Sequence, residues 1–251
     1  MPTVVGMAAV YDRIGIGYAD LRVPDPRIAQ QILDALGDGT VLNVGAGTGS
    51  YEPGSTVAAV EPSPVMLAQR PQGAAPAVRA VAEALPFADQ QFDAVLAVLT
   101  THHWTDPARG LDELRRVSRR QVILTWDQDF WTSRFWLLVD YLPEAAEREK
   151  DLAALRTITD HWPDARVDPV PIPHDCTDGF FAAYWRRPEA YLVPAVREAI
   201  SGLALLDQDV VTAAMDRLEQ DLADGAWASR HADLLGRDEL DCGYRLVVLG
   251  V

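Results

Sequence analysis

The sequence predicts an α/β fold, in which a doubly wound sheet of seven mostly parallel strands carries a helical insertion before its last strand. Between residues 40 and 98, short apolar runs alternate with polar, turn-rich connections, which is typical of a parallel sheet with crossover connections. A glycine-rich loop follows the first of these runs. From Phe130 onward the apolar residues recur at helical spacing, so we expect the second half to be mainly helical.

Seven segments rich in Val, Leu or Ala have the length of strands. Five of them precede residue 127 and two follow it, and together they would complete one sheet. The predicted strands are residues 40–44, 57–61, 77–81, 92–98, 121–126, 167–173 and 244–251.

Three helices are predicted to begin at a capping residue followed by proline, which suits the first helical position. The three pairs are Asp25-Pro26, Ser63-Pro64 and Asp106-Pro107. Longer helical patterns predict further helices over residues 130–142, 144–156, 193–206 and 209–222.

The chain has 251 residues, and we expect a single domain over residues 1–251. The residues between the two late strands are too many for a loop in a compact domain. We therefore expect residues 174–243 to form a helical cover over one edge of the sheet.

Acidic residues dominate the charge, since 22 Lys and Arg against 37 Asp and Glu give a net charge of −15. Such a surface repels phosphate backbones and anionic membranes, so we expect neither nucleic acid nor a membrane as partner. The two cysteines, Cys176 and Cys242, belong to no metal-ligand pattern, and we expect no metal. The N-terminal residues lack the positive segment of a secretion signal, and no apolar run approaches the length of a membrane span. We expect a cytoplasmic protein, whose oligomeric state is left open.

The strand over residues 40–44 leads into the loop Gly-Ala-Gly-Thr-Gly at residues 45–49. Glycines at alternate positions let the backbone turn sharply and let a ligand approach it closely. The next strand ends in Glu61, whose carboxylate can accept hydrogen bonds from both hydroxyls of a ribose. A dinucleotide-binding loop needs glycine where Ser50 stands and an acid about 20 residues further on, whereas Glu61 lies 12 residues beyond Gly49. The spacing favours a mononucleoside ligand.

In combination, four motifs resemble the class I S-adenosylmethionine-dependent methyltransferases, in particular the small-molecule branch called the type 11 methyltransferase domain. The motifs are residues 41–49, 57–61, 83–87 and 92–95, and the resemblance covers residues 11–127. It implies a Rossmann-like methyltransferase fold, S-adenosylmethionine as the cofactor and S-adenosylhomocysteine as the product.

By that resemblance, the cofactor contacts begin in the glycine loop and continue along the following strands. Glu61 would bind the ribose, and Met66 would flank the adenine, although Met66 fits an ordinary core position equally well. The other expected contacts are Gly45, Ala46, Gly47 and Gly49 for the methionine part, Ala82 and Glu83 for the adenine, and Leu99 after the fourth strand.

Residues before the first helix resemble the family's N-terminal cover segment. Arg22 could pair with the cofactor carboxylate, because a guanidinium fork suits a carboxylate, or with one of the many surface acids. Tyr11, as a cofactor contact, or Tyr18, as a substrate contact, could close over the methyl group. Asn43 stands where the family usually has an acid, and Val81 stands where many relatives have an aspartate for the adenine.

Side chains suited to the chemistry follow the fourth and fifth predicted strands. Methyl transfer is an in-line displacement, so the protein must align a nucleophile, exclude water and, for some acceptors, remove a proton. Adjacent side chains in extended backbone point opposite ways, so we expect one histidine to face the pocket as general base, His103 in preference to His102. Trp104 and Trp126 would wall the substrate, and His174 could approach it from the segment after the sixth strand.

Aromatic residues near these loops favour an uncharged or aromatic substrate. We expect methyl transfer to an oxygen, nitrogen or carbon atom of a small apolar or aromatic molecule. Two alternatives remain open. One is a protein that binds S-adenosylmethionine without transferring its methyl group, and the other is a nicotinamide oxidoreductase, which Ser50 and the short distance to Glu61 disfavour.

Overall fold

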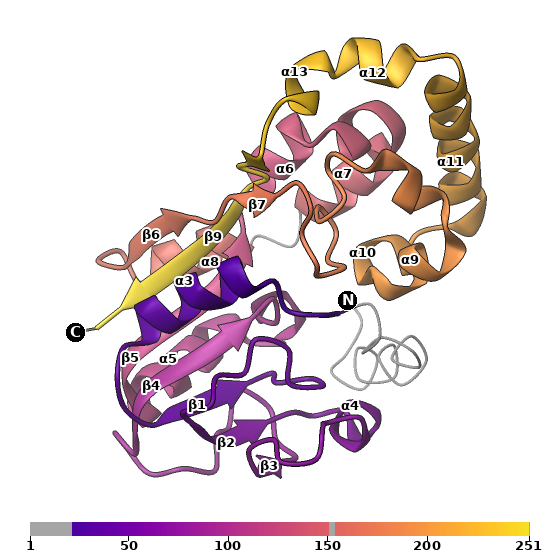
Figure 1. Ribbon diagram of the computed structural model, residues 1–251. Coiled ribbons are helices and arrows are strands. Elements are labelled where there is room, and N and C mark those ends of the chain that lie inside the picture. The colour runs from indigo at the N-terminus through magenta and orange to yellow at the C-terminus, as the bar shows by residue number, and fades with distance from the viewer. Residues whose placement is uncertain (1–21, 151–153, 251) are drawn as a thin grey trace.

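Seven strands form one sheet in the computed structural model, which describes residues 22–150 and 154–250 (Figure 1). They are β1 (Val41–Val44), β2 (Thr56–Val60), β3 (Ala77–Val78), β4 (Phe92–Val98), β5 (Ser118–Trp126), β6 (Arg166–Pro169) and β9 (Tyr244–Leu249). The order across the sheet is β3-β2-β1-β4-β5-β9-β6. Neighbours from β3 to β5 are parallel, and β9 runs antiparallel to both β5 and β6. The predicted sheet of seven mostly parallel strands is confirmed.

The central strands are apolar because both faces of the sheet are covered. All four residues of β1 are buried. In β4, Val95 belongs to the core on one face and Leu96 to the core on the other, and Val122 and Ile123 of β5 alternate in the same way. This period of two residues gives the molecule two apolar cores, one on each side of the sheet.

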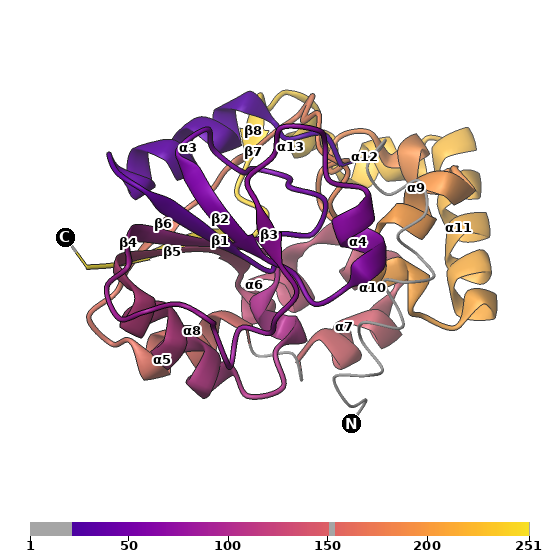
Figure 2. The ribbon, with the colours of Figure 1, turned by 90° about the horizontal axis from the view of Figure 1, so that it is seen from below.

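Helices cover the two faces separately (Figure 2). Helix α3 (Pro26–Leu36) packs on one face, and helices α5 (Pro107–Val117) and α8 (Ala154–His161) pack on the other. The short helix α4 (Pro64–Ala68) follows β2.

The predicted helix starts are confirmed in detail. The side chains of Asp25, Ser63 and Asp106 each accept a hydrogen bond from a backbone N–H in the first turn of α3, α4 and α5. Each pair also places proline at the start of its helix. A backbone N–H at that position has no acceptor within the helix, so its absence in proline costs no hydrogen bond.

A further layer of helices lies beyond the end of the sheet toward which β4 points (Figure 1). Two segments of chain build this layer, and the hydroxyl of Tyr141 in the first donates to Asp221 in the second at 2.6 Å. The second segment falls within residues 174–243, whereas the first precedes them. The first contains α6 (Gln128–Arg134), the π-helix η2 (Leu137–Tyr141) and α7 (Pro143–Lys150). The second contains the 3-10 helix η3 (Pro188–Leu192), α9 (Pro194–Ala199), α10 (Ser201–Ala204), α11 (Gln208–Ala223), α12 (Ala226–Arg230) and α13 (Ala232–Leu235).

Several predicted elements are wrong in extent. The helix expected over 130–142 divides into α6 and η2. The range 144–156 contains most of α7 and the start of α8, and residues 151–153 lie outside the described residues. The helix expected over 193–206 is interrupted at Ile200, which is extended (φ −98°, ψ 100°). Within the described ranges, no helix combines the length and apolar character needed to cross a membrane.

The strand expected over 167–173 also divides in two. Its first part is β6, and its second part, β7 (Ile172–Pro173), pairs with β8 (Glu239–Leu240) in a separate two-stranded sheet. Pro171 lies between them and has no backbone N–H to continue the ladder. Residue 251, the end of the last predicted strand, lies outside the described residues.

Asp25 is fully buried and does more than cap α3. Its carboxylate accepts hydrogen bonds from the backbone N–H of Arg27 (2.9 Å), from Nη2 of Arg27 (2.7 Å) and from the backbone N–H of Thr177 (3.2 Å). Burial opposes the charged form, but these bonds and the positive charge of Arg27 outweigh it and lower the pKa of Asp25 to about 2.

We expect Asp25→Asn to lower the free energy of unfolding by about 1–3 kcal/mol at pH 7, because a buried charge-assisted acceptor is lost. The folded pKa lies below the ordinary value of 3.8, so the carboxylate stabilises fully above that pH and progressively less as the pH falls towards about 2. Urea unfolding at several pH values measures both effects. Asp34→Asn, at an exposed position of the same helix, is the control. Equal stability of wild type and Asp25→Asn at pH 7 would contradict the role given to Asp25.

Candidate functional site

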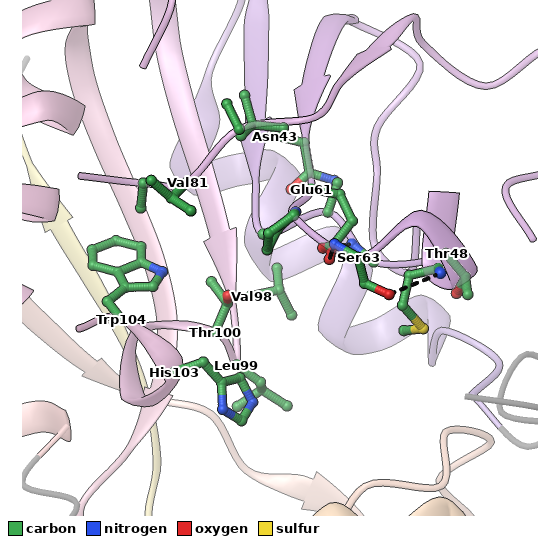
Figure 3. A pocket seen from close by; sticks show the side chains of 18 of the residues that line it. Asn43, Thr48, Glu61, Ser63, Val81, Val98, Leu99, Thr100, His103 and Trp104 are labelled. Carbon is green, nitrogen blue, oxygen red and sulfur yellow. Dashed lines mark hydrogen bonds between the residues drawn. The ribbon is translucent and has the colours of Figure 1, made fainter. Parts of the chain in front are cut away.

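A pocket opens where β1, β2 and β4 end, with an empty volume of about 1090 Å³ that is partly open to solvent (Figure 3). Trp104, Thr100 and His103 lie on one side of it, and Glu61 and Ser63 lie on the other. The predicted site residues in its lining are Arg22, Gly45, Ala46, Gly47, Glu61, Met66, Ala82, Glu83, Leu99, His103 and Trp104.

The glycine loop is fixed by the end of β2. The backbone N–H groups of Gly45 and Ala46 both donate to the carbonyl of Val60, at 2.9 Å and 3.0 Å. Gly45 has a φ of +68°, and a Cβ at this position would lie 2.1 Å from the hydroxyl oxygen of Thr100. Glycine is therefore required at position 45 both by the backbone conformation and by the close approach of the segment after β4.

Glu61 joins the glycine loop to the start of α4. Its carboxylate accepts hydrogen bonds from the backbone N–H of Gly47 and from that of Ser63, both at 2.8 Å, and the residue is 7% exposed. Burial raises the pKa of Glu61, although the two backbone bonds and the positive charge of Arg70 act against this. Each carboxylate oxygen keeps capacity for a further donor, which a ribose hydroxyl could supply.

Asn43 lines the pocket at the position where the family usually has an acid, and its side chain is hydrogen-bonded to that of Glu52. Its Nδ2 donates to Glu52 at 3.0 Å, and Nη2 of Arg70 donates to both oxygens of Glu52 at 2.8 Å. Since Glu52 holds the amide nitrogen, the amide oxygen of Asn43 is the acceptor that this side chain can offer to a ligand.

The chain turns sharply as it leaves β4. Leu99 has a φ of +49°, which is rare for a residue with a branched side chain and costs conformational energy. The following 3-10 helix η1 (Thr101–His103) then brings His103, but not His102, into the pocket lining. Trp104 lies against α5, where a Cβ on Gly110 would be 2.4 Å from the indole. Gly110 therefore leaves the room that the Trp104 indole occupies against α5.

The two histidine rings lie with their centroids 3.6 Å apart. Burial lowers the pKa of His103 to about 4. Burial, and then the neighbouring His103, lower the pKa of His102 well below its ordinary value. Both rings are therefore neutral at pH 7.

A row of aromatic rings continues from the histidines into the interior, beneath the layer of helices. The ring of His102 lies 4.5 Å from that of Trp126, and Trp126 stacks on Trp131 at 5.4 Å. Trp131 in turn contacts Phe181 and Tyr244. Trp126 is 5% exposed, and its Nε1 is buried without a hydrogen-bond partner among the described residues.

Some predicted site residues lie elsewhere. Gly49 faces Arg70, and His102 and Trp126 lie behind the pocket lining in the aromatic row. His174 is the furthest departure, because both its backbone N–H and its ring Nδ1 are bonded to the carbonyl of Asp238 beside the two-stranded sheet. Tyr11 and Tyr18 lie outside the described residues.

The pocket also contains residues to which no binding role was given. Most of them neighbour a predicted residue at a strand end, so the carboxyl edge of the sheet was the signal that could have identified them. They are Thr48, Ser50, Val60, Pro62, Ser63, Ala80, Val98, Thr100 and Thr105, together with Asn43 and Val81. No group of three or more potential metal ligands gathers in the part of the chain that the structure describes.

Comparison with known proteins gives a consistent result. A family model described as a methyltransferase domain matches residues 39–125. A solved structure from Anabaena variabilis, of a proposed methyltransferase from an antibiotic biosynthesis pathway, is 33% identical, with a TM-score of 0.84. That match covers 92% of this chain and 99% of the Anabaena chain.

Two further relatives match less of the chain. An S-adenosylmethionine-dependent methyltransferase of Thermotoga maritima shares the fold, with a TM-score of 0.51 and 21% identity over 65% of this chain and 84% of that one. An uncharacterized methyltransferase of Mycobacterium tuberculosis (strain ATCC 25618 / H37Rv) is 44% identical over 88 residues, which are 32% of this chain and only 35% of the relative.

The Anabaena match extends over nearly the whole chain, and the glycine loop and Glu61 line one pocket. The chain belongs to the class I S-adenosylmethionine-dependent methyltransferases.

Proposed function

We propose that this protein transfers a methyl group from S-adenosylmethionine to a small, uncharged molecule that is aromatic or otherwise apolar. The observation that carries the proposal is the meeting of the glycine loop and the buried carboxylate of Glu61 in one pocket. The carboxylate of Glu61 supplies acceptors for the hydroxyls of a nucleoside, and the glycine loop lets the ligand approach the backbone closely.

The residues present fit S-adenosylmethionine. Glu61 would accept hydrogen bonds from the ribose hydroxyls, and the glycine loop would lie along the methionine part. Arg22, which lines the same pocket, would face the carboxylate of that part. Met66, Ala82 and Glu83 would flank the adenine, with Leu99 beside the thioether end.

When bound, the cofactor supplies an electrophilic methyl group on a sulfonium. An acceptor held in the pocket would take up this methyl group, and the sulfur would leave as S-adenosylhomocysteine. The protein's part is to hold the acceptor in line and to keep water out, which the helical layer and Trp104 would do. Where the acceptor carries a proton, a ring nitrogen of His103 would receive it.

The neutral aromatic row supports an uncharged substrate. His103 is neutral at pH 7 and can accept a proton, but a pKa of about 4 makes it a weak base. Such a base is better matched to a weakly acidic O–H or N–H, as in a phenol, than to an alcohol. Trp104 would border the acceptor, and Trp126 would extend the apolar wall behind it.

Cofactor binding is tested first by thermal unfolding with S-adenosylmethionine, S-adenosylhomocysteine or NAD in excess. A ligand at about 100 times its dissociation constant stabilises by about 2.7 kcal/mol, so we expect an increase of a few degrees in Tm with the two sulfur nucleosides and none with NAD. Glu61→Gln should reduce this increase, and Glu219→Gln, at an exposed position of α11, should not. An increase with NAD alone, or with no ligand, would refute the proposal.

His103→Gln should lower turnover of a proton-bearing acceptor by about 10²- to 10⁴-fold and leave the affinity for S-adenosylhomocysteine unchanged. Since the pKa of His103 is about 4, the wild-type rate should stay level between pH 6 and 8 and fall only as the pH approaches that value. His161→Gln, on α8 outside the pocket, is the control. A turnover that is unchanged in His103→Gln would remove the assignment of His103 as base.

Gly110→Ala should force the Trp104 indole towards the pocket, because the added Cβ would lie 2.4 Å from it. We expect about tenfold weaker binding of S-adenosylhomocysteine or about tenfold lower turnover, while the helix itself gains stability from alanine. In a Trp104→Ala background the same substitution should have no further effect. Gly236→Ala is the matched control, since open space surrounds that glycine. An equal effect of Gly110→Ala with and without Trp104 would contradict this role of Gly110.

A further inference from the structure

A buried ion pair joins two parts of the chain that are 156 positions apart. Arg22 donates from Nε to Oδ1 of Asp178 at 2.7 Å and from Nη2 to Oδ2 at 3.4 Å. The side chain of Asp178 is fully buried, and that of Arg22 is 9% exposed. The backbones of the two residues also form an isolated antiparallel bridge. This two-point contact fixes both the position and the plane of the guanidinium.

Arg22 is at the same time a residue of the pocket lining. Its carbonyl accepts a hydrogen bond from the hydroxyl of Ser50 at 3.3 Å, and Ser50 lines the pocket directly after the glycine loop. The neighbouring Tyr51 is buried, and burial, followed by the negative charge of Asp178, raises its pKa. Arg22 therefore connects the pocket lining with a carboxylate that belongs to the segment leading into the helical layer.

A second ion pair between the same two segments has no contact with the pocket. Nη1 of Arg27 lies 2.8 Å from Oδ1 of Asp175, and the two side chains are 49% and 59% exposed. Arg27 lies outside the pocket lining. The two pairs thus differ in burial and in their relation to the pocket, although both attach residues 175–178 to residues 22–27.

We propose that Asp178 is a positioning residue for the cofactor, which holds Arg22 where its guanidinium faces the carboxylate of the amino-acid part of S-adenosylmethionine. This inference rests on the proposed function. Without Asp178, Arg22 would carry a buried charge without its carboxylate partner and would turn towards solvent. The binding contribution of a prearranged guanidinium would then be lost. The side chain of Arg22 would thus couple the binding of the cofactor to the attachment of residues 175–178.

Two ligands separate this role from a general effect on the fold. S-adenosylhomocysteine has the amino-acid carboxylate, whereas 5′-methylthioadenosine keeps the nucleoside and the thioether but lacks that carboxylate. We expect Asp178→Asn to raise the Kd of S-adenosylhomocysteine about tenfold and to leave the Kd of 5′-methylthioadenosine within about twofold, by titration calorimetry. Asp175→Asn, which breaks the exposed pair in the same segment, should change neither Kd.

Three outcomes overturn the proposal while the proposed function stands. They are an equal loss of affinity for both ligands, unchanged binding of S-adenosylhomocysteine to Asp178→Asn, and tighter binding of it. If the wild-type protein binds neither ligand, the proposed function itself fails and this inference fails with it.

Hydrogen exchange in the wild-type protein gives a test that does not depend on the folding of a variant. The backbone N–H of Gly179 donates to Oδ1 of Asp178 at 2.7 Å. With the pocket saturated, this N–H should exchange at least several-fold more slowly with S-adenosylhomocysteine than with 5′-methylthioadenosine, because only the former adds a carboxylate to Arg22. Equal exchange rates with the two ligands overturn the proposal.

Discussion

The carboxylate of Glu61 holds the pocket in its shape. It stands at the end of β2 and accepts backbone hydrogen bonds from the glycine loop on one side and from the start of α4 on the other. Burying a carboxylate costs free energy unless hydrogen-bond donors surround it. These two bonds therefore make the burial of Glu61 possible, and they also support the loop. The positive φ of Gly45 and the close packing of Thr100 depend on the loop staying where Glu61 and Val60 fix it.

The side of the pocket across from Glu61 differs in charge from the protein as a whole. The chain as a whole carries a net charge of −15, but the row from His103 to Trp131 is neutral, since burial keeps both histidines unprotonated. His103, the member of this row that lines the pocket, therefore brings no formal charge to the pocket wall. Negative charge in the pocket lining is instead carried by Glu61 and Glu83.

The parts of the structure that the sequence could predict are those with a local cause. Asp25 caps α3 because an acceptor and a proline stand side by side, and Glu61 falls at a strand end because the apolar run stops there. We chose between His102 and His103 from the alternation of side chains in extended backbone. The cause in the structure is different, because Leu99 leaves the extended conformation and a 3-10 helix follows. The partner of Arg22 could not be predicted, since Asp178 is one of many acids and only the folded chain brings it near.

The same distinction applies to the helical layer. Apolar spacing indicated helices after residue 130, but it did not indicate the extended backbone of Phe135 and Ile200, where two of these helices are interrupted. The π-helix η2 has no separate signal in the spacing, and its Tyr141 finds Asp221 80 positions later. The spacing of apolar residues shows which face of a helix is buried, but it does not show which other segment that face packs against.

The order of strands has a consequence for how the protein assembles. Among the described residues, β6 pairs in the large sheet with β9 alone, and β9 follows it by more than 70 residues. During synthesis β6 cannot pair with β9 until residues 245–248 have been made, and the helices of the second segment are made in that interval. The sheet up to β5 can form from short crossovers, whereas its far edge needs a long-range pairing, which is the slower kind of contact to form.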